Sequence, residues 1–482
     1  MKKIIIVGAG PSGIIAAKTA KKLGLEPIIF EAKDEIGGVW SLKNNMIWNS
    51  LRTNLSKYSC MFSDFPWPSE IEEFPTGIAV NQYLHDFCQF HDLSDCIRLN
   101  SKVLKLEFKE EKWLVSVECH SKVTLMASDY AIITSGFFNK PFIPEIYDRV
   151  GNEIIHSSSY KAPIGFEQQK VCVVGGSFSA YEIASELTQV IAQVTHLTTR
   201  EVHILPRYIK AKQIDKSIPI DIFMYSRKKA SKKLSEFEQH ENTREFLLSI
   251  APDPGAISKD LQIRRGSGDP PFVVISDDYL DHVSTGKIKV SRCTKDEMAS
   301  KLQLERYDKV IFCTGYRPEL NYLDREVLKL LNYDKNDALQ PFILAYAAIP
   351  PVLKNLGFVG MYRGPYFAIM ELQAQLAVSK MCDPSRLHFD VESRLSEELS
   401  IREKRPRPQF PHGNYTEFGD SLANELGVYP NVSNNLKDVV MNGPYLPSHF
   451  GLNNELTDKK AAEKVIWEVE ASYPWKERAL YV

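Results

Sequence analysis

Two segments of the chain share one pattern, in which a short apolar strand leads through a glycine-rich turn into a helix. The first segment runs from Ile4 to Leu23, and the second runs from Val171 to Leu187. Strands that alternate with helices in this way pair in parallel, and the helices cover the sheet. We therefore predict an α/β fold with two Rossmann-like dinucleotide-binding domains.

The first turn carries the complete dinucleotide-binding motif G-x-G-x-x-G. Its residues are Gly8, Gly10, Pro11, Ser12 and Gly13. The first glycine allows the tight turn, the second lets the backbone approach a pyrophosphate, and the third lets helix and strand pack closely. The N–H groups at the start of the helix then face the phosphates. The next strand ends in Glu31, about 20 residues after the glycines, where an acidic side chain holds the ribose hydroxyls.

The second turn departs from the ideal motif. Gly175 occupies the first glycine position of the motif, and Ala180 replaces the third glycine. Between them the turn contains Ser177, Phe178 and Ser179. A register that starts at Gly176 also fits. The next strand ends in Arg200 instead of an acid. A guanidinium binds the nearly dianionic 2′-phosphate that a carboxylate would repel, so the second nucleotide is predicted to be NADPH, with Arg200 on that phosphate. The alternative is a solvent-exposed arginine at a strand end.

Two dinucleotide units in one chain indicate a flavin and a nicotinamide that are placed for hydride transfer, here FAD and NADPH. The eight cysteines form no C-x-x-C pair and no cluster with zinc spacing. This argues against a dithiol reductase and against a metal site. The electrons then need another acceptor, and we expect dioxygen.

Composition narrows the class of protein further. The chain has 482 residues, a formal net charge of −2 and 25% charged residues, so no global field recruits nucleic acid or acidic lipid. No run reaches the roughly 20 apolar residues that span a bilayer. Reduced cysteines fit a cytoplasmic protein. We expect neither nucleic acid nor a membrane as a partner. The sequence does not decide between a monomer and a homodimer.

The order of the segments predicts how the domains are arranged. We expect the first part of an FAD-binding domain in 1–165, an inserted NADPH-binding domain in 166–304, and the second part of the FAD-binding domain with a helical tail in 305–482. Apolar and polar residues alternate within 102–118, which predicts hairpin strands. The polar stretch 208–270 has helical character, and its basic run from Arg227 onward is interpreted as a solvated helix face.

Several further segments carry a resemblance to a known family. They are Ile36-Gly37-Gly38-Val39-Trp40, Leu51-Arg52-Thr53-Asn54-Leu55-Ser56-Lys57, Phe62-Ser63-Asp64-Phe65-Pro66, Ser135-Gly136 with Pro141, Cys313-Thr314-Gly315-Tyr316, Phe358-Val359-Gly360 and Glu371-Leu372-Gln373. Over nearly its whole length the chain resembles the flavin-containing monooxygenases, which are class B flavoprotein monooxygenases. The resemblance implies that the cofactors contact Gly38, Val39, Trp40, Thr53, Asn54, Ser135, Gly136, Thr314, Gly315, Tyr316 and Gln373.

One motif of that family is degraded. The family pattern is F-x-G-x-x-x-H-x-x-x followed by Tyr or Trp. Val150 and Asn152 replace its Phe and Gly, whereas His156 and Tyr160 match. We interpret His156 as a residue that positions a linker between the two units, and a direct catalytic role is the alternative.

The resemblance also implies an activity, that of an N,N-dimethylaniline monooxygenase. NADPH would reduce FAD, dioxygen would form a flavin hydroperoxide, and the nitrogen or sulfur of a small amine or sulfide would take the distal oxygen. Asn54 is the expected catalytic residue, because its amide can donate and accept hydrogen bonds beside the reactive flavin edge. The alternative for Asn54 is a turn residue that bonds its own backbone.

Three rival functions stay open. One is Baeyer–Villiger oxygenation of a ketone, and another is NADPH oxidation that releases hydrogen peroxide. The third is a non-enzymatic protein in which FAD is only structural. Tyr160 favours oxygenation of a nitrogen or sulfur atom, because the related Baeyer–Villiger enzymes end the motif with Trp. The match at Thr53-Asn54 argues against a pure binding module.

Overall fold

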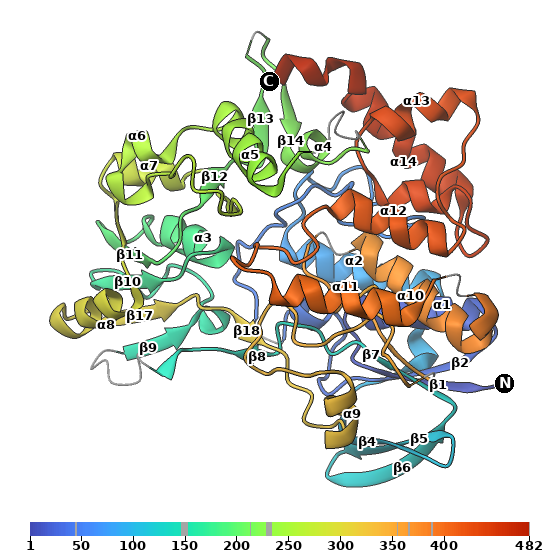
Figure 1. Cartoon of the computed structure of the whole chain (residues 1–482). Coiled ribbons are helices and arrows are strands. Elements are labelled where there is room, and N and C mark those ends of the chain that lie inside the picture. The colour runs from blue at the N-terminus through green and yellow to red at the C-terminus, as the bar shows by residue number, and fades with distance from the viewer. Residues whose placement is uncertain are drawn as a thin grey trace.

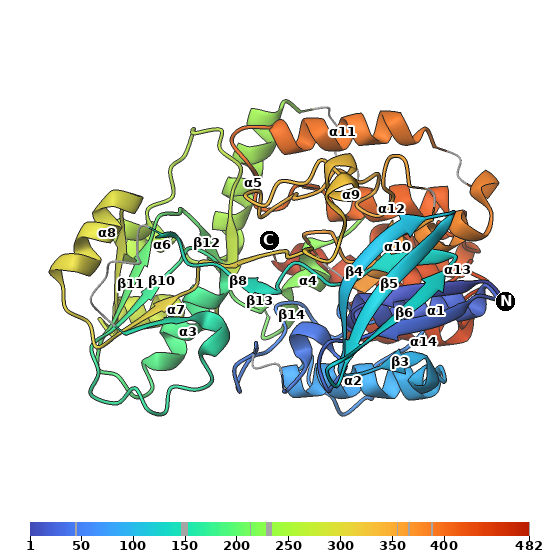
Figure 2. The same cartoon turned by 90° about the horizontal axis from the view of Figure 1, so that it is seen from below.

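Two five-stranded parallel sheets form the framework of the protein. The computed structural model describes residues 1–43, 46–145, 153–212, 214–227, 234–353, 355–364, 367–386 and 389–481. In Figure 1 the sheet that contains β1 lies at the lower right and the sheet that contains β10 lies at the left. Figure 2 shows the same two units at opposite ends of the molecule when it is seen from below.

The first sheet has the strand order β19-β7-β1-β2-β3, and its neighbouring strands pair in parallel. Its strands are β1 (Lys3–Val7), β2 (Glu26–Phe30), β3 (Ile97–Arg98), β7 (Tyr130–Ile133) and β19 (Leu356–Phe358). The side chains of Ile4, Ile5 and Ile6 are fully buried on both faces of the sheet, as expected for a central parallel strand. Helix α1 (Pro11–Lys22) joins β1 to β2 and packs against α10 (Phe367–Cys382).

The second sheet has the order β16-β11-β10-β17-β9 and is also parallel. Its strands are β9 (Glu153–His156), β10 (Val171–Val174), β11 (Val194–Thr198), β16 (Ile288–Arg292) and β17 (Lys309–Phe312), with α3 (Phe178–Leu187) after β10 and α8 (Lys295–Leu304) after β16. The predicted α/β fold with two units of this type is confirmed. Strands β9 and β17 lie outside the expected range 166–304, so the second sheet draws on a wider stretch of chain; the domain boundaries themselves stay a prediction.

A third sheet is antiparallel and contains β4 (Ser101–Lys109), β5 (Lys112–Cys119) and β6 (Lys122–Ser128). The hairpin predicted within 102–118 is confirmed as β4 and β5. A short strand pair, β8 (Lys140–Pro141) with β18 (Tyr316–Arg317), connects the segments that follow β7 and β17. Figure 2 shows β8 between the two large units.

The helical character expected for the stretch of about 208–270 is absent at its beginning. After β12 (His203–Leu205), which pairs with β15 (Val273–Ile275), the chain forms an antiparallel hairpin of β13 (Tyr208–Lys210) and β14 (Ser217–Pro219). Strands of three residues are too short to show an alternating pattern. Helices follow as α4 (Ile220–Met224), α5 (Glu236–Ile250) and α6 (Pro254–Ile257).

The interpretation of the basic run as a solvated face is wrong at Arg227. Its side chain is 5% exposed and forms an ion pair with Asp420 at 3.0 Å. Residues 228–233 lie outside the described residues. Because Asp420 is almost two hundred positions away in the chain, no local charge pattern could have indicated this pair.

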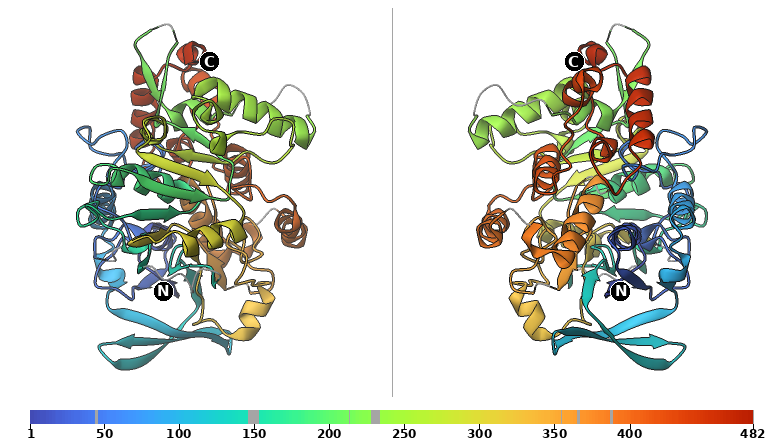
Figure 3. Two further views of the ribbon diagram at one scale, coloured as in Figure 1. Left: turned by 90° about the vertical axis from the view of Figure 1, so that its left-hand side faces the viewer. Right: turned by 90° about the vertical axis from the view of Figure 1, so that its right-hand side faces the viewer.

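The rest of the chain is mainly helical. Its helices are α7 (Tyr279–Ser284), α9 (Arg325–Leu330), α11 (Val391–Glu403), α12 (Tyr415–Glu425), α13 (Asn434–Asn442) and α14 (Lys459–Ser472). Figure 3 shows the C-terminal end of the chain near the β13–β14 hairpin, and there the backbone N–H of Lys212 donates to the carbonyl of Leu480. In the part of the chain that the structure describes, no helix is long and apolar enough to cross a bilayer.

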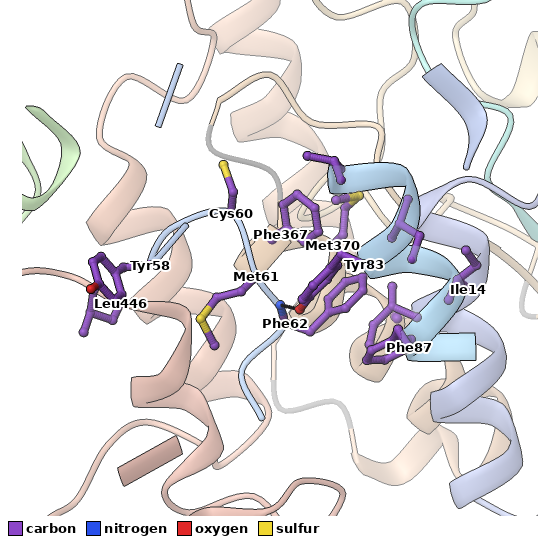
Figure 4. Packing of buried hydrophobic residues seen from close by; sticks show 14 of the residues in the cluster. Ile14, Tyr58, Cys60, Met61, Phe62, Tyr83, Phe87, Phe367, Met370 and Leu446 are labelled. Atoms are coloured by element: carbon purple, nitrogen blue, oxygen red, sulfur yellow. Dashed lines mark hydrogen bonds between the residues drawn. The ribbon is translucent and has the colours of Figure 1, made fainter. Parts of the chain in front are cut away.

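An apolar cluster holds the segment around Phe62 against the first unit. Phe62 packs on Phe87 of α2 (Gly77–Phe90) and on Phe367 of α10, with ring centroids 4.6 and 5.2 Å away. Its backbone N–H donates to the hydroxyl of Tyr83, and Figure 4 shows this bond among the buried side chains. Burial of aromatic side chains of this size is a strong stabilising contribution. The loop that precedes Phe62 therefore has a rigid support.

Candidate functional site

One cavity of about 1780 Å³ is lined by residues from both dinucleotide-type units. The predicted site residues in its wall are Gly8, Gly10, Pro11, Ser12, Glu31, Gly38, Val39, Trp40, Thr53, Asn54, Ser135, Gly136, Gly175, Ser177, Phe178, Ser179, Arg200, Thr314, Gly315 and Tyr316. Gly13, Ala180 and Gln373 are not part of the wall. The turns after β1 and β10 both open into this cavity, which is where ligands bind in parallel α/β sheets.

The first glycine turn leaves the start of α1 free for a ligand. Gly8 has a φ of +109°, which favours glycine. Helix α1 begins after Gly10 with Pro11 in its first turn, and no side chain caps its N–H groups. A Cβ on Gly38 would lie 3.0 Å from the Cα of Gly10, so the two backbones approach closely. An uncapped helix start beside bare backbone fits a pyrophosphate.

Gly13 supports this turn from behind. A Cβ at Gly13 would lie 1.9 Å from the carbonyl oxygen of Gly8. Its role is therefore the close packing of helix on strand, as the motif predicts. The clash leaves no room for any other residue at this position.

Glu31 is a buried carboxylate in the cavity wall. Its Oε2 accepts a hydrogen bond from the N–H of Ala9 at 2.8 Å, and its Oε1 accepts one from the N–H of Lys33 at 3.0 Å. Burial raises the pKa of Glu31, and these two N–H groups oppose the rise. Each oxygen has a further lone pair, so the carboxylate fits a sugar hydroxyl while it holds the glycine turn.

The second turn has the same construction. A Cβ at Gly175 would lie 2.6 Å from the carbonyl oxygen of Cys313. Ser177 precedes α3 but its side chain makes no capping hydrogen bond, so this helix also starts uncapped at the cavity. Ala180 is fully buried behind the turn, where the small side chain allows the packing that glycine gives in the ideal motif.

Arg200 lies in the wall beside this second turn. Its guanidinium carbon is 5.0 Å from the centroid of the Phe272 ring. Among the residues that the structure describes, no carboxylate forms an ion pair with Arg200. The side chain is exposed, and it presents an uncompensated positive charge to the cavity, which fits an anionic group.

Asn54 follows an anchored residue and has an unengaged side chain. Thr53, the residue before it, is buried; its N–H donates to the carbonyl of Pro75 at 2.9 Å, and its hydroxyl donates to the carbonyl of Leu55 at 2.7 Å. The half-buried amide of Asn54 makes no hydrogen bond to any described residue, its own backbone included. The alternative of a self-bonded turn residue is therefore not what the structure shows.

The segments after β7 and β17 meet beside the cavity. Gly136 and Gly315 have φ values of +75° and +85°, and the hydroxyl of Thr314 donates to the carbonyl of Phe142. The ring of His156 is 3.0 Å, through Nε2, from the carbonyl oxygen of Gly315. His156 is buried and is not in the cavity wall, so the structure places it at the linker. The replaced motif residues Val150 and Asn152 lie outside the described residues.

Gln373 lies behind the cavity wall. Its fully buried side chain accepts from the N–H of Gly360 at 2.9 Å and donates to the carbonyls of Tyr346 and Ala347. Gly360 is part of the wall. Gln373 therefore shapes the site through Gly360 and does not face it.

Sequence reasoning missed a set of basic side chains in the wall. These are Lys33, Arg52, Lys102, Lys161, Lys295, Arg363 and Arg407. They come from segments spread over the whole chain and follow no shared spacing. Arg52 and Arg407 already pair with Glu72 and Asp337. The charges of the other five side chains complement a ligand that carries several phosphates.

A family model described as flavin-binding monooxygenase-like matches residues 1–453. The N-oxide-forming dimethylaniline monooxygenase 2 of Mus musculus is 27% identical over 475 residues, which cover 89% of this chain and 83% of that protein.

Two solved structures share the fold at low identity. The S-allyl-L-cysteine S-oxygenase from Allium sativum has a TM-score of 0.61 and 18% identity, and the match covers 99% of this chain and 94% of that one. Cyclohexanone monooxygenase from Rhodococcus sp. Phi1 bound to NADP⁺ has a TM-score of 0.64 and 13% identity, with 88% and 97% covered.

Proposed function

The chain belongs to the flavin-binding monooxygenase-like family, and from this premise we propose that it oxygenates a nitrogen or sulfur atom of a small nucleophilic substrate with FAD and NADPH as cofactors. The observation that carries the proposal is the single cavity onto which both uncapped glycine turns open. Such an arrangement lets two dinucleotides bring their reactive rings together.

FAD is assigned to the first turn. The N–H groups at the start of α1 would bind its pyrophosphate, Glu31 would accept from its ribose, and the close backbones of Gly10 and Gly38 leave room for phosphate oxygens. When bound and reduced, this cofactor supplies the electrons that activate dioxygen. The protein's part is to bind, to orient and to exclude water.

NADPH is assigned to the second turn. The start of α3 would bind the pyrophosphate, and Arg200, which has no carboxylate partner among the described residues, would bind the 2′-phosphate. Stacking over Phe272 keeps the planar guanidinium in one orientation. The preference for NADPH over NADH follows from that one charge.

Asn54 is assigned to the reacting end of the site. An amide that follows an anchored residue and whose donor and acceptor are both unengaged can bind a polar group. The same cavity wall also contains apolar side chains, among them Leu55, Phe367 and Met370. Apolar walls with one polar anchor suit a small amine or thioether, and they keep bulk water away from the anchor.

The experiment that tests the proposal measures NADPH consumption, dioxygen uptake and product for three substrates: trimethylamine, a thioether and cyclohexanone. We expect an N-oxide or a sulfoxide in step with NADPH. A lactone from cyclohexanone without heteroatom oxidation would assign the Baeyer–Villiger rival. Hydrogen peroxide in place of every product would assign an NADPH oxidase.

A further inference from the structure

The buried guanidinium of Arg207 contacts three separate segments of the chain. Its Nη2 donates to Oε2 of Glu182 at 3.0 Å, its Nη1 donates to Oδ2 of Asp277 at 2.8 Å, and its Nε donates to the carbonyl oxygen of Thr53 at 3.1 Å. The residue is only 6% exposed. All three donor groups of the fork are used, which a lysine cannot reproduce.

These partners belong to both units. Glu182 lies on α3, the helix that starts at the second glycine turn, and Asp277 follows β15. Thr53 belongs to the loop that precedes Phe62 and carries Asn54. One side chain therefore connects the helix assigned to the nicotinamide nucleotide with the peptide group that joins Thr53 to Asn54.

Asp221, at the other end of the β13–β14 hairpin, holds the same loop a few residues later. This fully buried carboxylate accepts from the N–H of Ser56 at 3.0 Å, and from the hydroxyls of Ser56 and Ser59 at 2.6 Å each. Among the described residues it has no cationic partner. The N–H of Ile220 donates to the carbonyl of Arg207 at 2.9 Å, so the two anchors are part of one closed hairpin.

We propose that Arg207 and Asp221 are positioning residues that couple nucleotide binding in the second unit to the geometry of the loop 53–60. A nucleotide that orders the start of α3 restricts Glu182, and the guanidinium passes this restriction to the carbonyl of Thr53. The coupling is reciprocal, so an ordered loop also favours the nucleotide. This inference rests on the proposed function for its assignment of NADP(H) to the second turn.

Amide hydrogen exchange of the FAD-loaded protein, with and without saturating NADP⁺, tests the coupling without turnover. In the wild type, NADP⁺ is expected to slow exchange both at 175–182, where it binds, and at 53–60, which it reaches through Arg207. In Arg207→Lys the effect at 175–182 is expected to stay and the effect at 53–60 to disappear. Exchange of the loop without nucleotide should be about tenfold faster, which is the equivalent of one lost charge-assisted hydrogen bond.

Arg244→Lys is the matched control. Arg244 is 2% exposed and belongs to the same inserted segment, but its partners are Glu201, Glu241, Ser267 and Asp269, and none of them lies in the loop 53–60. We expect this variant to respond to NADP⁺ at 53–60 as the wild type does. If Arg207→Lys does not fold, Glu182→Gln removes the charge from the α3 contact alone and should reduce the response at 53–60.

The outcomes separate the inference from the proposed function. If NADP⁺ leaves 175–182 unprotected in the wild type, the nucleotide assignment is wrong. If NADP⁺ protects 175–182 but does not slow exchange at 53–60 in the wild type, the coupling is wrong and the nucleotide assignment stands. The same conclusion follows if Arg207→Lys and Glu182→Gln both respond at 53–60 as strongly as the wild type. Loss of the loop response in Arg244→Lys would also overturn the coupling, because any buried arginine would then have this effect.

Discussion

The amide of Asn54 follows the anchored residue Thr53 and has no hydrogen-bond partner among the described residues. Replacement by leucine keeps the volume and removes both the donor and the acceptor. One preorganised donor in a site of this kind contributes about 2.7–4 kcal/mol. We expect Asn54→Leu to retain FAD and anaerobic reduction by NADPH, but to form at least about tenfold less oxygenated product per NADPH, with hydrogen peroxide in its place.

The measurement for Asn54→Leu is the ratio of product to NADPH, together with the anaerobic reduction rate. Asn321→Leu is the control, because Asn321 is exposed and is not in the cavity wall. Unchanged coupling in Asn54→Leu would show that the amide does not serve the oxygen step.

Arg200 is the second residue whose role depends on a missing partner. Arg200→Ala removes a charge-assisted contact worth about 1.5–3 kcal/mol, so the KM for NADPH should rise by about one to two decades. The KM for NADH should barely change, because NADH lacks the 2′-phosphate. Steady-state kinetics with both cofactors check this.

Arg264→Ala is the control for Arg200→Ala. Arg264 is an exposed arginine of the same unit that pairs with Glu201 at 2.9 Å. Equal losses for NADPH and NADH in Arg200→Ala would assign Arg200 to the fold.

At the scale of elements, strand β11 supports the second glycine turn through His196. The carbonyl of Gly175 can only accept, so Nε2–H of His196 donates to it at 2.8 Å, and Nδ1 accepts from the hydroxyl of Tyr279 at 2.6 Å. Burial lowers the pKa of His196 to about 4 from 6.5. The folded protein therefore keeps the ring neutral at pH values where the unfolded chain already binds a proton.

The free energy of unfolding should accordingly fall as the pH drops from 6.5 to 4. His196 stabilises the fold fully above pH 6.5, and roughly 3 kcal/mol of this is lost by pH 4. His91 and His203 add to the slope, because burial also lowers the pKa of each to about 4. Urea unfolding at several pH values gives the slope of the unfolding free energy against pH. In His196→Gln this slope should be smaller than in the wild type by up to about 1.4 kcal/mol per pH unit. A slope equal to that of the wild type would contradict the assignment.

Elements with strong local signals could be predicted from the sequence. The strands β1 and β10 are continuous apolar runs that end in glycine turns, and few folds other than a dinucleotide-binding unit combine these two features. The β13–β14 hairpin could not be predicted, because strands of three residues are too short to show the alternation of apolar and polar side chains that indicates a strand. Strand β6 was also missed, since most of its residues are exposed and an edge strand needs no apolar face.

At the scale of the whole molecule, the cavity depends on contacts that no local pattern contains. The two turns, Glu31 and Arg200 were predicted because each lies at a set distance along the chain from a glycine motif, whereas Asn54 was expected only from the resemblance to the flavin-containing monooxygenases. Arg207 could not be predicted, since its partners at 53, 182 and 277 are brought together only by the fold. The same holds for Arg363 and Arg407, which reach the wall from the C-terminal part of the chain.

That C-terminal part is tied to the second unit by Gln409. Its side-chain Oε1 accepts from the N–H of Val273 at 2.8 Å, and its Nε2 donates to the carbonyl of Val273 at 2.8 Å. The amide thus replaces a neighbouring strand beside β15, whose partner on the other side is β12. Gln409 and Val273 both lie in the cavity wall, so this tie joins the wall of the second unit to the C-terminal part of the chain.

Loss of the tie should affect NADPH and leave FAD in place. A neutral hydrogen bond contributes about 0.5–1.5 kcal/mol, and Gln409 makes two of them, so Gln409→Ala should raise the KM for NADPH by at least about twofold to tenfold. Flavin content and the midpoint of thermal unfolding should stay close to those of the wild type, because the core of neither sheet is touched. Gln82→Ala, which removes only a contact to Asp86 within α2, should change none of these values. If the KM for NADPH in Gln409→Ala equals that of the wild type, the segment around Gln409 covers the cavity without holding its second unit in place.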